Sequence, residues 1–205
     1  MGLWAQGLHH AVAAPHSGAP VCLVVGDSLS AEYGLRRGSG WVALLAERMA
    51  QQAPGVQVVN ASVSGDTTAG GLSRLPALLR QHQPQLLVIE LGGNDALRGL
   101  PLGTTQQNLA RMAQLGRAAG ARVLLVGMQM PPNYGARYAQ DFAQLFRTVA
   151  QTEKTGLVPF LLKGIADTEG AERWFQADRI HPNESAHPRM LDNVWPELRK
   201  LLPKR

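Results

Sequence analysis

The chain has 205 residues, of which 45% are hydrophobic and 17% charged, and its formal net charge is +5. This composition is sufficient for one hydrophobic core and is not that of a disordered chain. No stretch of about 18 apolar residues occurs, so stable membrane insertion is not expected, and no Lys/Arg run is interleaved with aromatic residues, so nucleic-acid binding is not expected.

Residues 1–20 are predicted to be a disordered leader or a tag, and residues 21–205 to form one folded domain. The leader contains Ala11-Val12-Ala13, which resembles a signal-peptide cleavage site. It has no basic first region, however, and His9 and His10 interrupt the apolar stretch that a signal peptide requires. The fold prediction therefore concerns only the residues that follow.

The remaining sequence alternates apolar, strand-like runs with amphipathic helical segments. Val21–Val25 is a continuous apolar run that includes the single cysteine, Cys22, and it is typical of a strand buried on both faces. Further strands are predicted over residues 56–59, 86–91, 123–126 and 157–160, and helices over 40–53, 71–83, 104–119, 138–152 and 186–202, the last interrupted near Pro188 and Pro196. Strands separated by helices predict an α/β fold, namely a three-layer α/β/α sandwich around about five parallel strands.

Four short segments rich in small and polar residues follow predicted strands. Ligands of parallel sheets bind beyond the carboxyl ends of the strands, so these segments are expected to meet at one edge. They are residues 26–30, 64–66, 92–95 and 178–182, with the sequences Gly-Asp-Ser-Leu-Ser, Ser-Gly-Asp, Gly-Gly-Asn-Asp and Asp-Arg-Ile-His-Pro. Together they offer a hydroxyl, hydrogen-bond donors and an imidazole with a nearby carboxylate, which is the composition of a site that attacks an acyl carbonyl.

Ser28 and His181 are predicted to be the nucleophile and its general base. A serine hydroxyl is a poor nucleophile until a base removes its proton, and Asp178 is placed to orient His181 if the segment makes one turn. Taken alone, Ser28 also fits a helix N-cap or a phosphate-binding turn, and the 178–182 segment also fits a surface turn before a helix. His187 is the only rival base that the sequence offers.

Three donors are predicted to stabilise the oxyanion: the backbone N–H groups of Ser28 and Gly65 and the side-chain amide of Asn94. Gly65 has no Cβ to block a close approach, although both it and Asn94 also fit ordinary turns. Asp27 is predicted to be structural. Glu90 stands within an apolar strand, and it is predicted to be hydrogen-bonded at the sheet end near the site because an unpaired buried charge is costly.

These segments resemble the SGNH (GDSL-type) hydrolase family, and the similarity runs over about residues 21–202. All four blocks of the family are present, as Gly26-Asp27-Ser28-Leu29, Gly65, Gly92-Gly93-Asn94-Asp95 and Asp178-x-x-His181-Pro182. The flanking residues are similar to the branch of bacterial multifunctional acyl-CoA thioesterases, lysophospholipases and arylesterases. The resemblance implies a flavodoxin-like SGNH hydrolase fold for residues 21–205, catalysis by Ser28, Asp178 and His181, and an oxyanion hole formed by Ser28, Gly65 and Asn94.

The resemblance also implies a substrate site. Residues 96–100 resemble a mobile substrate loop. The residues expected to line the acyl pocket are Leu97, Leu100, Met128, Met130, Pro131 and Tyr134. Each of these residues also fits ordinary packing. No metal and no organic cofactor is implied, and the expected partner is a small-molecule acyl ester or thioester. Relatives are often periplasmic or secreted, so that location is the expected one.

The sequence therefore predicts a serine hydrolase that cleaves carboxylic esters and thioesters through an acyl-enzyme. The second hypothesis is a carbohydrate acetylesterase of the same mechanism, which would need exposed aromatic side chains near the site, whereas only 5% of the residues are aromatic. The third is a non-enzymatic, flavodoxin-like module that binds a phosphate or a flavin at Ser28 and Gly65. Such a module would not need Asp178 and His181 together.

Overall fold

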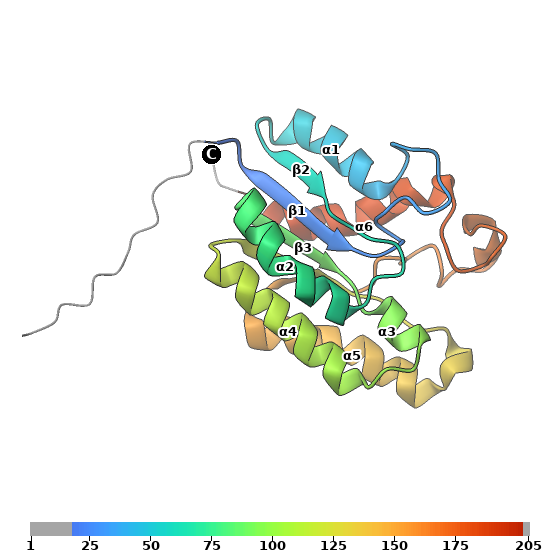
Figure 1. Ribbon diagram of the computed structural model, residues 1–205. Helices are drawn as coiled ribbons and strands as arrows, with labels where there is room; N and C mark the ends of the chain where they lie inside the picture. The colour runs from blue at the N-terminus through green and yellow to red at the C-terminus, as the bar shows by residue number, and fades with distance from the viewer. Residues whose placement is uncertain (1–17, 203–205) are drawn as a thin grey trace, which may run out of the picture.

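The computed structural model describes residues 18–202 of the chain, so most of the predicted leader lies outside the described residues. The strands form one parallel, five-stranded sheet in the order β2-β1-β3-β4-β5 (Figure 1). Their bounds are Val21–Gly26 for β1, Gln57–Asn60 for β2, Leu86–Glu90 for β3, Arg122–Val126 for β4 and Gly156–Val158 for β5.

Helices cover both faces of the sheet (Figure 1). On one face lie α1 (Trp41–Gln52) and α6 (His187–Lys200), and on the other lie α2 (Thr68–His82), α4 (Leu102–Ala118) and α5 (Ala136–Glu153). The loops contain the short helix α3 (Gly93–Leu97) and the 3-10 turns η1 (Pro132–Tyr134), η2 (Ala171–Trp174) and η3 (Glu184–Ala186). This architecture confirms the predicted three-layer α/β/α sandwich. Within residues 18–202, no helix is both long enough and apolar enough to cross a membrane.

Alternate residues of β1 belong to two hydrophobic cores, one on each face of the sheet. Cys22 and Val24 pack in the core that α1 and α6 cover, whereas Leu23 and Val25 pack in the core under α2, α4 and α5. All four side chains are fully buried, which explains why the strand is apolar at every position rather than at every second one. Burial also raises the pKa of the Cys22 thiol to about 12, as expected of a packing residue rather than a reactive one.

The register of the sheet brings the predicted site segments together. Gly26, the last residue of β1, lies beside Glu90, the last residue of β3. On its other side, Val24 of β1 lies beside Asn60 at the end of β2. The chain therefore leaves the ends of β1, β2 and β3, three adjacent strands, as three neighbouring loops, which hold Ser28, Gly65 and Asn94 respectively.

Two helices differ most from their prediction, because capping and packing decide where a helix begins and whether it continues. α2 begins at Thr68, three residues before the predicted start, since the Thr67 side chain accepts a hydrogen bond from the Gly70 N–H and caps the helix. α6 is continuous, so the predicted interruption near Pro188 and Pro196 is wrong. Pro188 occupies the first turn, where no intrahelical N–H is required, and around Pro196 the helix buries its apolar stripe against the sheet.

The end of β5 and the helix α3 also differ from the prediction. β5 ends at Val158 rather than at residue 160, because Pro159 has no N–H with which to continue the ladder. α3 was not predicted, since its sequence, Gly-Asn-Asp-Ala-Leu, lacks helical periodicity. Gly92 precedes it with a φ of 115°, a left-handed conformation that favours glycine.

Candidate active site

Ser28 lies in a tight turn that directly follows β1. The backbone carbonyl of Asp27 accepts hydrogen bonds from the N–H groups of Ser30 (3.2 Å) and Ala31 (2.9 Å), and the Asp27 carboxylate accepts from the Leu29 N–H (3.0 Å). Between residues 22 and 30, Ser28 is the only residue that is not buried. The turn therefore gives this one hydroxyl access to solvent while its neighbours anchor the backbone.

A hydrogen-bonded relay connects Ser28 to the segment that follows β5. The Nε2 atom of His181 lies 3.0 Å from the Ser28 Oγ, and its Nδ1 atom lies 2.7 Å from the Oδ2 of Asp178. The hydroxyl and the imidazole are 153 positions apart in the sequence. Their contact gives the arrangement in which the imidazole can take the serine proton while the carboxylate holds the other ring nitrogen.

The 178–182 segment makes the single turn that this relay requires. The Oδ1 of Asp178 accepts hydrogen bonds from the N–H groups of Ile180 (2.9 Å) and His181 (3.0 Å), and Arg179 between them has a φ of 57°, in the left-handed region. Partial burial opposes ionisation, but these backbone donors, the ring hydrogen bond and the charge of His181 together lower the pKa of Asp178 to about 2. Asp178 is therefore an anion at neutral pH.

Two residues that were not predicted to form the relay hold its imidazole and its loop. The ring of Tyr33 stands 4.4 Å from that of His181, centroid to centroid. His187, considered as a rival base, is buried, and its Nδ1 accepts a hydrogen bond from the Trp41 N–H (2.9 Å) at the start of α1. The His187 ring also forms a hydrogen bond with the backbone of Pro182. His187 therefore ties the relay segment to α1, and it does not contact Ser28.

Gly65 lies at the tip of the loop between β2 and α2, and Arg98 holds it there. Its φ is 79°, a conformation that strains any residue with a Cβ. The Nη2 of Arg98, at the end of α3, donates a hydrogen bond to the Gly65 carbonyl (2.9 Å). Because this bond engages the Gly65 carbonyl, it restrains the orientation of the peptide group that follows Gly65.

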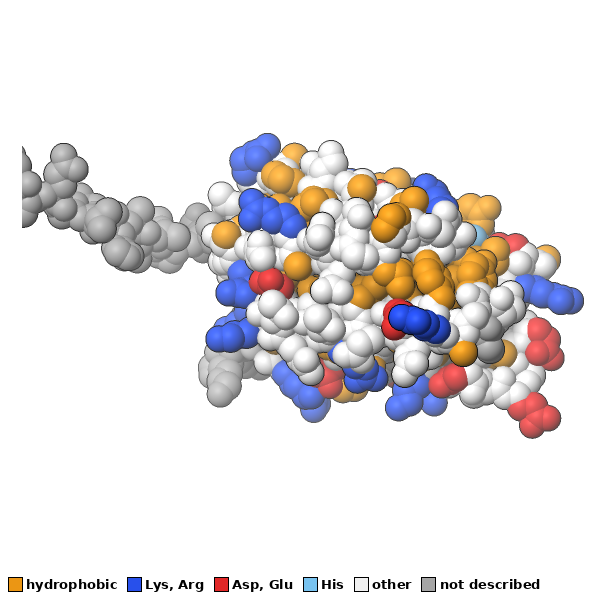
Figure 2. Space-filling view, turned by 90° about the horizontal axis from the view of Figure 1, so that it is seen from below, with side chains coloured by type: hydrophobic (Ala, Val, Ile, Leu, Met, Phe, Trp, Pro, Cys, Tyr) orange, Lys and Arg blue, Asp and Glu red, His pale blue; other side chains and the backbone are white. Residues whose placement is uncertain are grey.

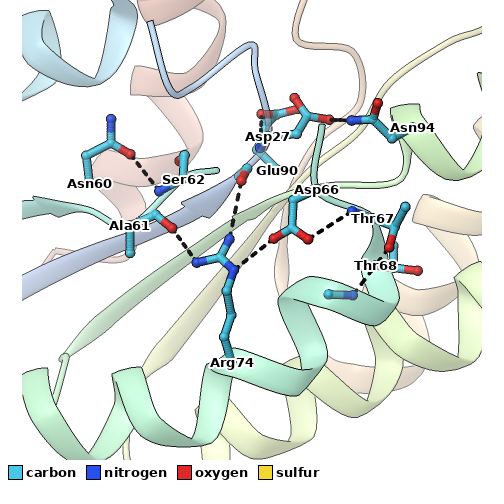
Figure 3. Close-up of polar contacts among 12 residues, drawn as sticks. Asp27, Asn60, Ala61, Ser62, Asp66, Thr67, Thr68, Arg74, Glu90 and Asn94 are labelled. Carbon is cyan, nitrogen blue, oxygen red and sulfur yellow. Dashed lines mark hydrogen bonds and ion pairs between the residues drawn. The ribbon is translucent and has the colours of Figure 1, made fainter. Parts of the chain in front are cut away.

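Arg74 of α2 joins the same loop to the end of β1, as Figure 3 shows. Its Nε donates to the Asp66 carboxylate (2.8 Å), and its Nη atoms donate to the backbone carbonyls of Ala61 and, at 3.4 Å, of Gly26. One guanidinium therefore binds the two loops that hold Ser28 and Gly65. No local sequence pattern indicates this role, since Arg74 stands in an ordinary amphipathic helix.

Asn94 and two buried carboxyl groups lie behind the nucleophile turn (Figure 3). The Nδ2 of Asn94 donates to the Asp27 Oδ2 (3.1 Å), and the hydroxyl of Ser30 donates to the Glu90 Oε2 (2.7 Å). The second contact confirms the predicted hydrogen bond of Glu90 at the sheet end. Burial raises the pKa of Glu90 well above its usual range, and the neighbouring charge of Asp27 raises it further.

A pocket of about 370 Å³ opens beside the relay. Five of the six residues expected to bind the acyl group line it, namely Leu97, Met128, Met130, Pro131 and Tyr134, whereas Leu100 is exposed and does not. The sequence did not single out the other apolar lining residues, Phe160, Leu162, Ala166, Phe175 and Ile180. A larger pocket of about 440 Å³ lies between α1 and β2, but no residue of the relay lines it, whereas Asp178 lines the smaller pocket.

The exposed large hydrophobic side chains of the described residues all lie in loops that follow strands. They are Tyr33, Val63, Leu97, Leu100, Tyr134 and Ile180. Figure 2 shows a band of hydrophobic side chains that broadens toward the right of the view, the end to which the strands point in Figure 1. The exposed large hydrophobic side chains of the described residues are therefore concentrated in the strand-end loops, from which the relay is also built.

The geometry agrees with what comparisons with known proteins show. The model of the GDSL-like lipase/acylhydrolase family matches residues 24–189, which is most of the chain. The chain belongs to this family. It is 57% identical over 184 residues to esterase TesA of Pseudomonas aeruginosa, covering 90% of each chain. It is 41% identical over 184 residues to thioesterase 1/protease 1/lysophospholipase L1 of Escherichia coli strain K12, covering 90% of this chain and 86% of that one.

A solved structure gives the same answer for the fold. The crystal structure of TesA superposes with a TM-score of 0.85 at 57% identity, covering 89% of this chain and 99% of the other. The resemblance to SGNH hydrolases that the sequence indicated is therefore confirmed, and the protein is a carboxylic ester hydrolase of the GDSL-like family.

Proposed function

We propose that the protein hydrolyses carboxylic esters and thioesters through an acyl-enzyme on Ser28, with His181 as general base and Asp178 as the residue that orients it. The observation that carries the proposal is the unbroken relay from the Ser28 hydroxyl through His181 to Asp178, with contacts of 3.0 Å and 2.7 Å. Hydroxyl, imidazole and carboxylate at these distances are the machinery of acyl transfer.

The proposed reaction has two halves. His181 Nε2 accepts the Ser28 proton as Oγ attacks the acyl carbon, and the resulting imidazolium is stabilised by the ionised Asp178. The imidazolium then protonates the leaving alcohol or thiol, and the acyl group remains on Ser28. In the second half His181 activates a water in the same way, and attack on the acyl-enzyme releases the acid and restores the hydroxyl.

The negative charge that develops on the carbonyl oxygen needs donors held in place beforehand. We assign this role to the backbone N–H groups of Ser28 and Gly65 and to the Nδ2 of Asn94. Two observations support this assignment. Each of the three donors lies in a different loop at the end of a neighbouring strand, and hydrogen bonds from Arg98 and Arg74 hold the Gly65 loop in place. Removal of one such donor typically lowers kcat by about 10²–10³.

The acyl group is proposed to bind in the apolar pocket beside the relay. Its volume of about 370 Å³ and its lining by Leu97, Met128 and Met130 fit a short or medium aliphatic chain or an aryl ring better than a polar group. The names of the relatives, esterase and thioesterase/lysophospholipase, support esters and thioesters of fatty acids as substrates. Leu100 is proposed to act in the loop around the pocket rather than in its lining.

Labelling with a serine-directed fluorophosphonate, followed by mass mapping of the modified residue, tests the nucleophile. We expect modification of Ser28 alone, and loss of both labelling and p-nitrophenyl butyrate hydrolysis in Ser28→Ala. Undiminished turnover in that variant would refute the proposal. Octanoyl-CoA in parallel with the aryl ester separates thioesterase from esterase activity, and a burst of p-nitrophenol before the steady state would show that deacylation limits the rate.

A carbohydrate acetylesterase of the same mechanism is the second candidate. It is favoured by Tyr33 and Tyr134, which are 50% and 41% exposed near the relay and the pocket and are the kind of side chain that stacks on sugar rings. Release of acetate from acetylated xylan at a rate above that of butyrate from the aryl ester would favour this function over the first.

The location of the protein is proposed to be the periplasm or the exterior of the cell. The proposal is supported by the cleavage-like Ala11-Val12-Ala13 sequence and by the relation to TesA-type esterases. Fractionation of cells that express the full chain, with mass spectrometry of the mature N-terminus, tests it, because retention of Met1 in a cytoplasmic fraction would refute it.

A further inference from the structure

Two carboxyl groups that the proposed reaction does not use lie side by side behind the nucleophile turn. Asp27 follows Gly26 of β1, and Gly26 is the register partner of Glu90 in β3. Asp27 is 2% exposed and Glu90 is fully buried. Gly26 allows the close packing, because a Cβ there would lie 2.7 Å from the Ser30 Oγ and 3.0 Å from the Glu90 Oε2.

The surroundings of the pair cannot stabilise two negative charges. Asp27 accepts from the Leu29 N–H and the Asn94 amide, and the Glu90 Oε2 accepts from the Ser30 hydroxyl and, at 3.5 Å, from the Asp27 N–H. Among the described residues the Glu90 Oε1 has no donor. Two unpaired carboxylates in contact inside a protein would be very unfavourable.

The charged groups around the pair do not supply the missing cation. From α2, Arg74 reaches the backbone carbonyl of Gly26 and is committed to Asp66. From α3, Asp95 is another buried carboxyl group, and it is bound by Thr68 and Thr105. From the relay segment, His181 acts on Asp27 only through its charge. One proton must therefore be retained between Asp27 and Glu90.

The hydrogen-bond directions decide which carboxyl group keeps that proton. Ser30 accepts from the Trp41 Nε1 (3.2 Å), so its single hydroxyl proton is available to the Glu90 Oε2 (2.7 Å). This makes Oε2 an acceptor and leaves Oε1, the atom without a donor, as the protonated oxygen. The interaction between the two side chains raises the pKa of Glu90 and lowers that of Asp27, which agrees with a neutral Glu90 beside an ionised Asp27.

We propose that Glu90 carries the one proton that this pair of carboxyl groups retains. The ionised Asp27 is then a positioning residue that fixes the side-chain amide of Asn94 in the oxyanion hole. A carboxylate only accepts hydrogen bonds, so it can face the Nδ2 end of Asn94 but not its Oδ1 end. One Nδ2 hydrogen binds Asp27, and the other is left for the substrate oxygen. This inference rests on the proposed function, in which Asn94 is an oxyanion donor.

Loss of the charge on Asp27 would remove this constraint. A neutral side chain at position 27 can donate to the Asn94 Oδ1, so the amide can turn over and present an oxygen where the substrate needs a donor. Burial, the largest influence, raises the pKa of Asp27 to about 6, while the hydrogen bonds from Leu29 and Asn94 and the interaction with the Glu90 side chain oppose that rise. The charge is therefore present at neutral pH and is lost as the pH falls through this value.

The test compares five variants on an aryl butyrate, with kcat and KM measured separately. Asp27→Asn should lower kcat by about 10²–10³, as Asn94→Ala does, with KM within a few-fold of the original, because the lost contact belongs to the transition state. The double variant should be no slower than Asn94→Ala, since both changes remove the same donor. Glu90→Gln, which keeps a donor in place of the carboxyl proton, should retain far more activity than Glu90→Leu.

Glu153→Gln is the matched control, because Glu153 is also a buried acid, paired with Arg117 and remote from the relay. Its kcat should equal that of the original protein. Wild-type kcat in Asp27→Asn, or a double variant whose loss is the product of the single losses, would overturn the inference. Continued labelling of Ser28 with loss of activity in Ser28→Ala would show that the proposed function survives that result.

Infrared spectroscopy provides a test that does not depend on the folding of Asp27→Asn. The intact protein at neutral pH should show the C=O band of a protonated, buried carboxyl group, and the band should disappear in Glu90→Gln. Absence of the band in the intact protein, or its persistence in Glu90→Gln, would place the proton elsewhere and refute the inference.

Discussion

The stability of the protein should fall in mild acid because of His187, and the size of the effect follows from its environment. His187 is 2% exposed, its Nδ1 accepts from the Trp41 N–H at the start of α1, and its other contact is with the Pro182 backbone. A protonated ring could not accept that hydrogen bond, and its charge would be unfavourable at a helix N-terminus. Burial lowers the pKa of His187 from 6.5 to about 4, although the Pro182 contact and the charges of Glu32 and Glu184 act in the opposite direction.

The sign and magnitude of this change in stability follow from the linkage between proton binding and folding. The folded-state pKa of His187 lies below the unfolded value, so the unfolded chain binds a proton more readily between pH 6.5 and about 4. The stability that the neutral ring supports is fully present above pH 6.5 and is lost as the pH falls through this window. Since one pKa unit corresponds to about 1.4 kcal/mol, His187 should account for about 3 kcal/mol of lost stability at pH 4.

The assay is guanidinium unfolding, followed by tryptophan fluorescence, at pH 7 and at pH 4. His187→Asn is the comparison, because its Oδ1 can accept from the Trp41 N–H but does not titrate. The unfolding free energy of the original protein should fall by about 3 kcal/mol more than that of the variant between the two pH values. An equal fall in both proteins would show that His187 is not held neutral in the folded state.

Three further predictions concern the relay and the sheet. Asp178→Asn should lower kcat by about 10⁴ at neutral pH, as in other Ser-His-Asp sites, because the amide favours the wrong imidazole tautomer; an unchanged kcat for aryl butyrate would contradict the relay. Tyr33→Leu should lower kcat about threefold to tenfold, since an aromatic contact is worth about 0.5–1.5 kcal/mol. Tyr33→Phe, which keeps the ring, should leave kcat unchanged. Equal rates in both variants would show that the ring at 4.4 Å does not position His181. Gly127→Ala should reduce the free energy of unfolding by about 1–3 kcal/mol. The Cβ of the new alanine would lie 2.7 Å from the Pro159 carbonyl oxygen, a backbone atom that cannot rotate away. An unchanged melting temperature would contradict this prediction.

Much of the fold and the principal site segments could be predicted because their signals are local. The apolar runs that became β1 and β3 are buried on both faces, and that burial requires hydrophobic residues at consecutive positions. The Ser28, Gly65 and Asn94 segments each stand a few residues after a strand, and the His181 segment follows β5 after a longer connection that includes η2. All parallel strands point the same way. Fold and approximate site location therefore follow from the order of elements together with the chemistry of a few short segments.

Helix ends and pocket details were less predictable, because each depends on contacts outside the local pattern. The start of α2 depends on one cap by Thr67, and α6 continues through Pro196 because its apolar stripe is buried. Leu100 was expected in the acyl pocket, but the turn after α3 leaves it exposed. Phe160 and Phe175 come from loops whose course the sequence alone does not specify.

The sequence by itself determined the layered α/β fold, the strand-end position of the site segments and the chemical types that they contribute. Only the tertiary structure decided which groups support them: the Tyr33 ring on His181, the Arg98 and Arg74 bonds to the Gly65 loop, and the contact of Asp27 with Asn94 and Glu90. The physical reason is distance along the chain. Periodicity and turn chemistry act between residues a few positions apart, whereas these contacts mostly join residues tens of positions apart, which meet only when the sheet register brings the strand ends together.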